Sequence, residues 1–208
     1  SSTVNISGNA ELKDVKGGNL AAGIGSGYDS DKVDVVIDGG TINATGGDSA
    51  AGIGSGLNSR SSVTIKSGTV NAKGNQHSNS GSSGIGGSYA DVTISGGNIT
   101  ATGYDTGAGI GGSYSGDPRP GAAGIGDGAG AWSKIDPDAP PSNPNHIIIS
   151  GDAEVEAKAG ASTGGKTAAI GGGIVGEIPN DALSDDDHKV TGGSLTRYDP
   201  DGKKMEDY

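Results

Sequence analysis

The sequence predicts an all-β protein, a right-handed parallel β-helix (solenoid) of about five coils with three short strands in each coil. Two observations lead to this prediction: a glycine-isoleucine-glycine motif recurs along the chain, and a block of alternating apolar and polar residues recurs between its copies. Both return at a period of about 30 residues, which is typical of repeats that stack on their neighbours. Parallel crossover connections are right-handed in nearly all proteins, and this gives the expected hand of the coil.

The alternating block predicts the first two strands of each coil. Val35 and Ile37 are separated by one residue, so both side chains point to the same face of a strand. A glycine corner follows, and Ile42 and Ala44 then repeat the alternation in a second strand. The polar residues of this second strand, such as Thr41, should face outward. Equivalent inward pairs begin the other copies of the block: Val4 and Ile6, Val63 and Ile65, Val92 and Ile94, Ile147 and Ile149.

The glycine-isoleucine-glycine motif predicts the third strand of each coil. Stacking places like residues on like residues at the usual strand spacing of about 4.8 Å. The isoleucines of the motif should therefore form a ladder along one wall of the interior. Its members are Ile24, Ile53, Ile85 and Ile110, and a degenerate copy of the motif contains Ile170.

The composition excludes several classes of partner and site. Only 31% of the residues are hydrophobic and 43 of the 208 are glycine, yet the apolar residues keep fixed places in each repeat, which argues against disorder. A net charge of -11 argues against nucleic acid and anionic membrane as partners. The chain has no cysteine, so disulfides and thiolate metal sites are excluded. No apolar run approaches the ~18 residues of a membrane span, which excludes membrane insertion.

Residues 1–198 are expected to form one β-helix repeat domain, and 199–208 a C-terminal turn and cap. A long insertion at about 115–146 breaks the period and contains the only tryptophan. Loops inserted into solenoids often carry binding function. The chain opens in the middle of a repeat, so we expect it to be a module whose partners include neighbouring domains of the same polypeptide.

Aromatic residues are the candidate glycan-binding residues, because sugar rings pack their C–H faces on aromatic rings. The fifth residue after the first glycine of successive motifs is Tyr28, Leu57, Tyr89 and Tyr114. This spacing predicts a ladder of exposed side chains, which Tyr104 would extend near Tyr114. The alternative is that these tyrosines only cover a corner of the coil and stack on each other. The complete set of candidates is Tyr28, Tyr89, Tyr104, Tyr114 and Trp132, of which Trp132 lies in the insertion.

Metal and catalytic sites have less support. Asp29, Asp31 and Asp34 offer the carboxylate oxygens that Ca²⁺ prefers, but the calcium-binding repeat and the EF-hand pattern are both absent. Solvated acidic loops are therefore favoured over a calcium site. The three histidines belong to no recognisable triad, and no motif pairs two carboxylates as glycoside hydrolysis requires. The sequence thus predicts a protein that is not an enzyme.

The alternation of VTISGGNITATG (92–103) with GAGIGG (107–112) resembles the repeat modules of secreted and wall-anchored proteins of Gram-positive bacteria. The resemblance covers about residues 4–173. It implies a pectin-lyase-like β-helix, an extracellular or cell-wall location, and an accessory role in carbohydrate binding, adhesion and domain spacing. The Asn-Thr-Asp, Gly-Asp-Asp and Gly-His-Gly motifs of the catalytic proteins with this shape are absent. Two alternatives stay open: a polysaccharide lyase or glycosidase with a β-helix groove, and a structural stalk without a ligand.

Overall fold

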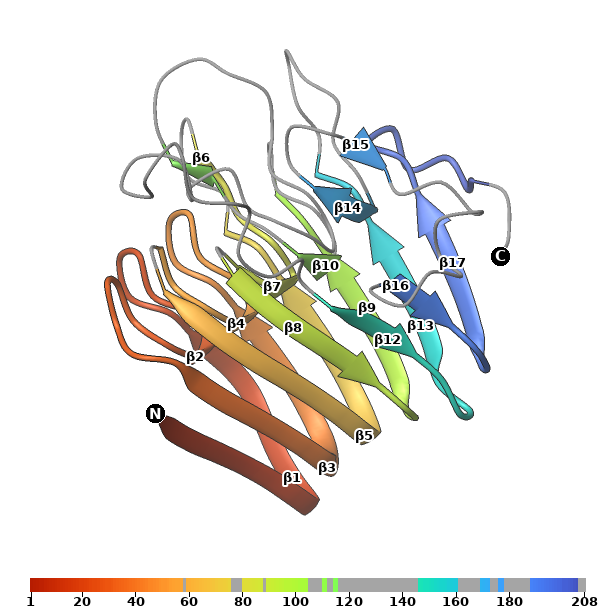
Figure 1. Cartoon of the computed structure of the whole chain (residues 1–208), viewed down its shortest axis with the longest axis horizontal. Coiled ribbons are helices and arrows are strands. Elements are labelled where there is room, and N and C mark those ends of the chain that lie inside the picture. The colour runs from red at the N-terminus through yellow and green to blue at the C-terminus, as the bar shows by residue number, and fades with distance from the viewer. Residues whose placement is uncertain are drawn as a thin grey trace.

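A computed structural model describes residues 1–57, 59–75, 80–87, 89–104, 110–111, 114–115, 146–160, 169–172, 176–177 and 188–205. Over these residues the chain forms a parallel β-solenoid without helices, which confirms the predicted fold class. Figure 1 shows the strands stacked side by side along the long axis, with β1 and β17 at opposite ends. No helix in this part of the chain has the length and apolar character of a membrane span.

The largest sheet contains the first two strands of successive coils. Each strand pairs in parallel with the equivalent strand of the next coil. The early coils use one long strand for both positions: β1 (Ser2–Lys16), β3 (Val33–Thr45) and β5 (Arg60–Lys73). The later coils use two: β8 (Tyr89–Ile94) and β9 (Asn98–Thr102), β12 (Ile147–Ile149) and β13 (Glu154–Lys158), β16 (His188–Val190) and β17 (Ser194–Tyr198).

The prediction of two separate strands is therefore right for the later coils and wrong for the early ones. In the early coils the pairing continues into the glycine corner, where Gly8 pairs with Gly39. Gly39 has a φ of 116°, a conformation that side-chain-bearing residues rarely adopt. The chain thus bends at the corner while its backbone keeps its partners on the neighbouring coil.

The glycine-isoleucine-glycine motifs form a second sheet, as predicted. Its parallel strands are β2 (Ile24–Gly25), β4 (Ile53–Gly54), β7 (Ile85–Gly86), β10 (Ile110–Gly111) and β14 (Ile170–Gly172). The register pairs the isoleucines of successive strands directly, and Ile170 of the degenerate motif joins the same ladder. Ile53, Ile85 and Ile170 are fully buried.

Two short antiparallel pairings were not predicted. β6 (Ser80–Gly81) pairs with β11 (Tyr114–Ser115), and β15 (Gly176–Glu177) pairs with β14. A two-residue strand has no periodicity of its own, so only the arrangement of the surrounding coils defines it.

The interior is filled by columns of identical or similar aliphatic residues. In the second strands, Ala44, Ala72, Ala101 and Ala157 lie on successive coils and are all buried. The first strands bury pairs of valine and isoleucine in the same way. Each fully buried isoleucine contributes about 1.5–3 kcal/mol of hydrophobic stabilisation. The narrow interior therefore needs no phenylalanine, and the sequence contains none.

The C-terminal end folds back on the last coil. The amide of Gly202 donates a hydrogen bond to the carbonyl of Asp199 (3.0 Å), and the amide of Lys203 donates to Asp199 Oδ1 (2.8 Å). The tight turn predicted at 199–202 is thus present. Met205 follows it, packs against the core and donates its amide to the carbonyl of Arg197 (2.9 Å). This segment covers part of the open end of the interior.

The fully buried ladder makes Ile53 a sensitive position. We expect Ile53→Asp to lower the free energy of unfolding by more than about 4 kcal/mol, because it places an unpaired carboxylate among apolar side chains. Thermal unfolding followed by circular dichroism measures the change. Thr41→Asp, at an exposed outward position of β3, is the control and should cost about 1 kcal/mol or less. Equal melting temperatures for the two variants would contradict an isoleucine ladder in the interior.

The second glycine of the motif is equally constrained. Gly54 has a φ of 136°, and a Cβ there would overlap the backbone of Gly86 on the next coil. We expect Gly54→Ala to destabilise the protein by more than about 2 kcal/mol, since both backbone strain and overlap oppose it. Gly18→Ala is the matched control, because no atom lies within 4 Å of a Cβ at Gly18. If urea unfolding gave the same midpoint for both variants, close contact between coils would be disproved.

Candidate functional site

The predicted ladder of tyrosines is not continuous. Tyr28 lies in a turn after β2 with 51% of its surface exposed, beside the buried Leu57. Tyr89, however, begins β8 and pairs with Arg60, and Tyr114 pairs with Gly81. The prediction was wrong because it assumed a constant distance between the motif and the next strand.

The shorter connection in the third coil explains the position of Tyr89. The stretch from Gly84 to Val92 is shorter than the equivalent stretch from Gly52 to Val63. Val63 and Val92 are nevertheless paired in the first sheet. Tyr89 follows its motif by the same number of residues as Leu57 does. Because the connection to the next strand is shorter, Tyr89 lies in that strand and does not stack on Leu57.

The structure pairs the backbones of Tyr104 and Tyr114 with one segment of the chain. Both pair with the segment 80–82: Tyr114 with Gly81, and Tyr104 with Ser82. The amide of Tyr104 donates to the carbonyl of Ser82 (2.9 Å), and the amide of Ser82 donates to the carbonyl of Tyr104 (3.3 Å). Tyr104 is half-buried, so part of its side chain is accessible. The backbones of two candidate residues from one repeat thus flank a segment from the preceding repeat.

Polar side chains surround Tyr104 at the bend between the second and third strands. Asn75 Nδ2 donates to Asp48 Oδ1 on the neighbouring coil (3.3 Å), and Ser82 Oγ donates to the carbonyl of Asn75 (2.8 Å). We call Asp48, Asn75, Ser82 and Tyr104 the Tyr104 corner. Its amide, carboxylate and aromatic ring are the groups that recognise the hydroxyls and C–H faces of a sugar.

Asp48, Asn75 and Ser82 were not identified as site residues from the sequence. The contacts of Asp48 with Asn75 and of Ser82 with Tyr104 each join two coils, so no local motif marks these residues. The only signal was the alignment of Gly47-Asp48 with Tyr104-Asp105 on a later coil. The alignment correctly places Gly47 and Tyr104 at the same bend of their coils. It does not predict the hydrogen bonds between coils at this bend.

The outward residues of the second strands form a regular polar surface next to this corner. We call this surface the second-strand face. On β3, β5 and β9 its columns run across the coils as Thr41, Thr69 and Asn98, then Asn43, Asn71 and Thr100, then Thr45, Lys73 and Thr102. Thr102 precedes Tyr104 by two residues, so the face continues into the Tyr104 corner. Neighbouring positions lie about 4.8 Å apart between coils and about 6.7 Å apart along a strand.

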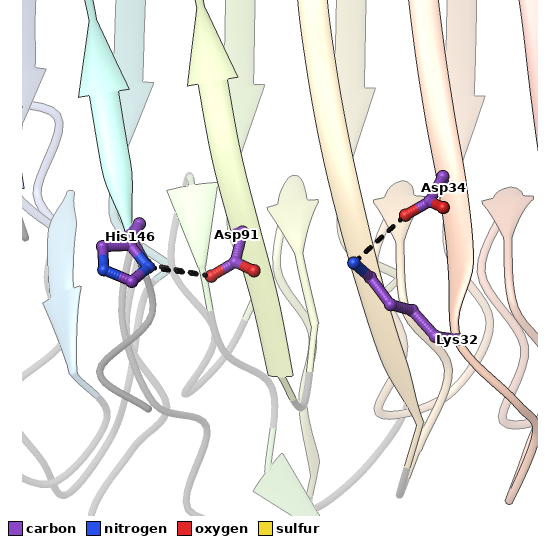
Figure 2. A network of polar contacts seen from close by, with 4 residues as sticks. All are labelled: Lys32, Asp34, Asp91 and His146. Atoms are coloured by element: carbon purple, nitrogen blue, oxygen red, sulfur yellow. Dashed lines mark hydrogen bonds and ion pairs between the residues drawn. The ribbon is translucent and has the colours of Figure 1, made fainter. Parts of the chain in front are cut away.

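A second group of polar contacts lies on the first strands (Figure 2). His146 Nδ1 lies 3.5 Å from Asp91 Oδ1, and Lys32 Nζ lies 3.2 Å from Asp34 Oδ1. The backbone amide of His146 also donates to Asp91 Oδ1 (3.1 Å). Ser62 separates Asp34 from Asp91 in the register, so the two backbones are about 10 Å apart. Each carboxylate thus has its own cationic or imidazole partner on the outer surface.

The predicted calcium ligands are not gathered into one site. Asp29 and Asp31 are exposed in the loop after β2, whereas Asp34 lies in β3 and pairs with Lys32. Within the described ranges, no group of three or more His, Cys, Asp or Glu residues lies close enough to hold a metal ion. The last aromatic candidate, Trp132, lies outside the described residues, as does the insertion from 116 to 145.

Comparison with known families gives one match. A family model described as Beta helix repeat matches residues 35–57, 63–89 and 92–114. Comparison with curated proteins and with solved structures gave no match. The family model covers three repeats, fewer than the five coils expected from the sequence. Together with the parallel stacking of the strands, the match supports a β-helix repeat of the pectin-lyase-like shape.

Proposed function

We propose that this chain is a non-catalytic accessory module of a secreted or cell-surface bacterial protein. It binds carbohydrate at the Tyr104 corner and holds neighbouring domains apart. The observation that carries the proposal is the pairing of Tyr104 and Tyr114 with one segment, residues 80–82, beside the side chains of Asp48 and Asn75. The resemblance of the repeats to those of wall-anchored Gram-positive proteins supports the cell-surface location.

The chemistry of the Tyr104 corner suits a sugar better than an ion or an apolar ligand. A pyranose has apolar C–H faces and a rim of hydroxyl groups, which need a ring to stack on and polar partners at its edge. Asn75 donates and accepts hydrogen bonds, while Asp48 accepts them. Both side chains are only half-buried, so they remain within reach of a ligand.

The role in domain spacing follows from the stacked architecture. β1 and β17 lie at opposite ends of the stack (Figure 1), so domains attached beyond them would be separated by its length. Continuous backbone pairing and buried aliphatic columns connect each coil to the next. A solenoid stabilised in this way resists bending, because bending would open many contacts along one side.

The placement of the described carboxylates supports a non-catalytic role. Acid–base cleavage of a glycosidic bond requires two carboxyl groups that face each other across the bond. Asp34 and Asp91 lie in one column on an outer surface and do not face one another. Each also has a polar partner: Lys32 Nζ lies 3.2 Å from Asp34 Oδ1, and His146 Nδ1 lies 3.5 Å from Asp91 Oδ1.

The tyrosines provide the first test of binding. A glycan array identifies ligands, and calorimetry then gives their affinities for the variants. We expect Tyr104→Ala and Tyr114→Ala each to weaken binding about 5- to 10-fold, because each removes a stacking surface worth about 1–1.4 kcal/mol. Tyr28→Ala is the matched control: this tyrosine is exposed but distant in register from the corner, so its removal should leave affinity unchanged.

Three results would count against this proposal. Unchanged affinity in both corner variants, with loss in Trp132→Ala, would move the site to the insertion. No binding to any glycan on the array would leave only the stalk. Release of new reducing ends or unsaturated sugars from a polysaccharide would show an enzyme. Circular dichroism of each variant distinguishes lost binding from lost folding.

A further inference from the structure

We infer that the second-strand face extends the binding site of the Tyr104 corner and that the ligand is an extended, uncharged polysaccharide. This inference rests on the proposed carbohydrate binding and specifies its substrate class. The face adjoins the corner and continues from Thr102 across three coils. The geometry, side-chain chemistry and charge of the face each support the inference.

The size of the face fits several sugars. Each second strand presents three outward positions about 6.7 Å apart, and β3, β5 and β9 lie about 4.8 Å apart. The outward side chains therefore span roughly 13 Å along the strands and 10 Å across them. This area exceeds one hexose, so affinity should rise with the length of the oligosaccharide.

The side chains of the face are already ordered for hydrogen bonding. Threonine hydroxyls and asparagine amides donate and accept, which matches the hydroxyl groups of a sugar. Threonine in a strand has few accessible rotamers because it is β-branched. Asn43, Asn71 and Thr100 in the middle column are half-buried, which restricts them further. These side chains therefore lose little conformational entropy when a ligand binds. Asn71 Oδ1 is fully buried and does not reach a ligand.

The charge of the face selects an uncharged ligand. β3 and β9 contribute no charge to it, and β5 contributes only Lys73. Carboxylates occur on both flanks: Glu11 and Asp14 in β1, Glu154 and Glu156 in β13. The whole protein has a net charge of -11, so long-range repulsion disfavours an anionic chain. An uncharged chain meets no such repulsion.

Lysines balance those carboxylates locally without making the face cationic. Lys13 lies 2.9 Å from Glu11, Lys16 lies 3.3 Å from Asp14, and Lys158 lies 3.4 Å from Glu156. These lysines are therefore engaged by neighbours on their own strands. Lys73 is the remaining cation of the face, and one positive charge is too few to offset the repulsion of a polyanion.

The test uses calorimetry with glucan, galactan and mannan oligosaccharides, from disaccharide to octasaccharide, and with oligogalacturonates of equal length. We expect affinity to rise with length for an uncharged series and to be at least about 10-fold weaker for the oligogalacturonates. Thr69→Val with Thr100→Val keeps the β-branched shape but removes two hydroxyls. This double variant should reduce binding of the octasaccharide about 10-fold and leave the disaccharide unchanged.

The control is Thr64→Val, on the first-strand part of β5, which should bind both lengths normally. Glu154→Gln with Glu156→Gln should strengthen binding of oligogalacturonates and leave uncharged chains unaffected.

If Tyr104→Ala abolishes binding while length and the threonines have no effect, the inference fails and the proposed function stands. Tighter binding of oligogalacturonates than of every uncharged series would also overturn it. Absence of all binding by the wild-type chain would overturn both.

Discussion

The structure depends on the direct stacking of one glycine-isoleucine-glycine strand on the next. The second glycine of the motif, as at Gly54, leaves no space for a side chain against Gly86, and its φ of 136° excludes most other residues. Because glycine lets the two strands approach this closely, Ile53 lies on Ile85, and the other aliphatic columns pack beside them in the interior. A chain with little apolar content can then fold, because small aliphatic residues are packed at every coil.

The same stacking produces the outer surface. A register that places alanine on alanine inside must also place threonine on threonine outside, since side chains alternate along a strand. Thr41 and Thr69, and likewise Asn43 and Asn71, are paired for this reason. A regular polar face is therefore a consequence of a repeated core. Specific features arise where a loop departs from the repeat, as at Asn75 and Ser82.

This distinction explains which features the sequence could predict. The interior ladder follows from two periodicities, alternation within a strand and return of the motif, and the structure confirms it at Ile24, Ile53 and Ile85. The tyrosine ladder used a fixed count from the motif, and the shorter loop before Val92 made that count fail at Tyr89. The meeting of Tyr104 with Ser82 depends on antiparallel pairing between loops, for which the sequence contains no periodic signal.

Local charge pairing matters more than net charge for what the molecule binds. The net charge of -11 argues against anionic partners in general, but it does not distinguish one surface from another. The ion pairs of Glu11 with Lys13 and of Glu156 with Lys158 join residues of the same strand and are exposed, so each adds at most about 1 kcal/mol to stability. They hold the lysines beside the carboxylates at the flanks, and the central coils expose hydroxyls and amides between them.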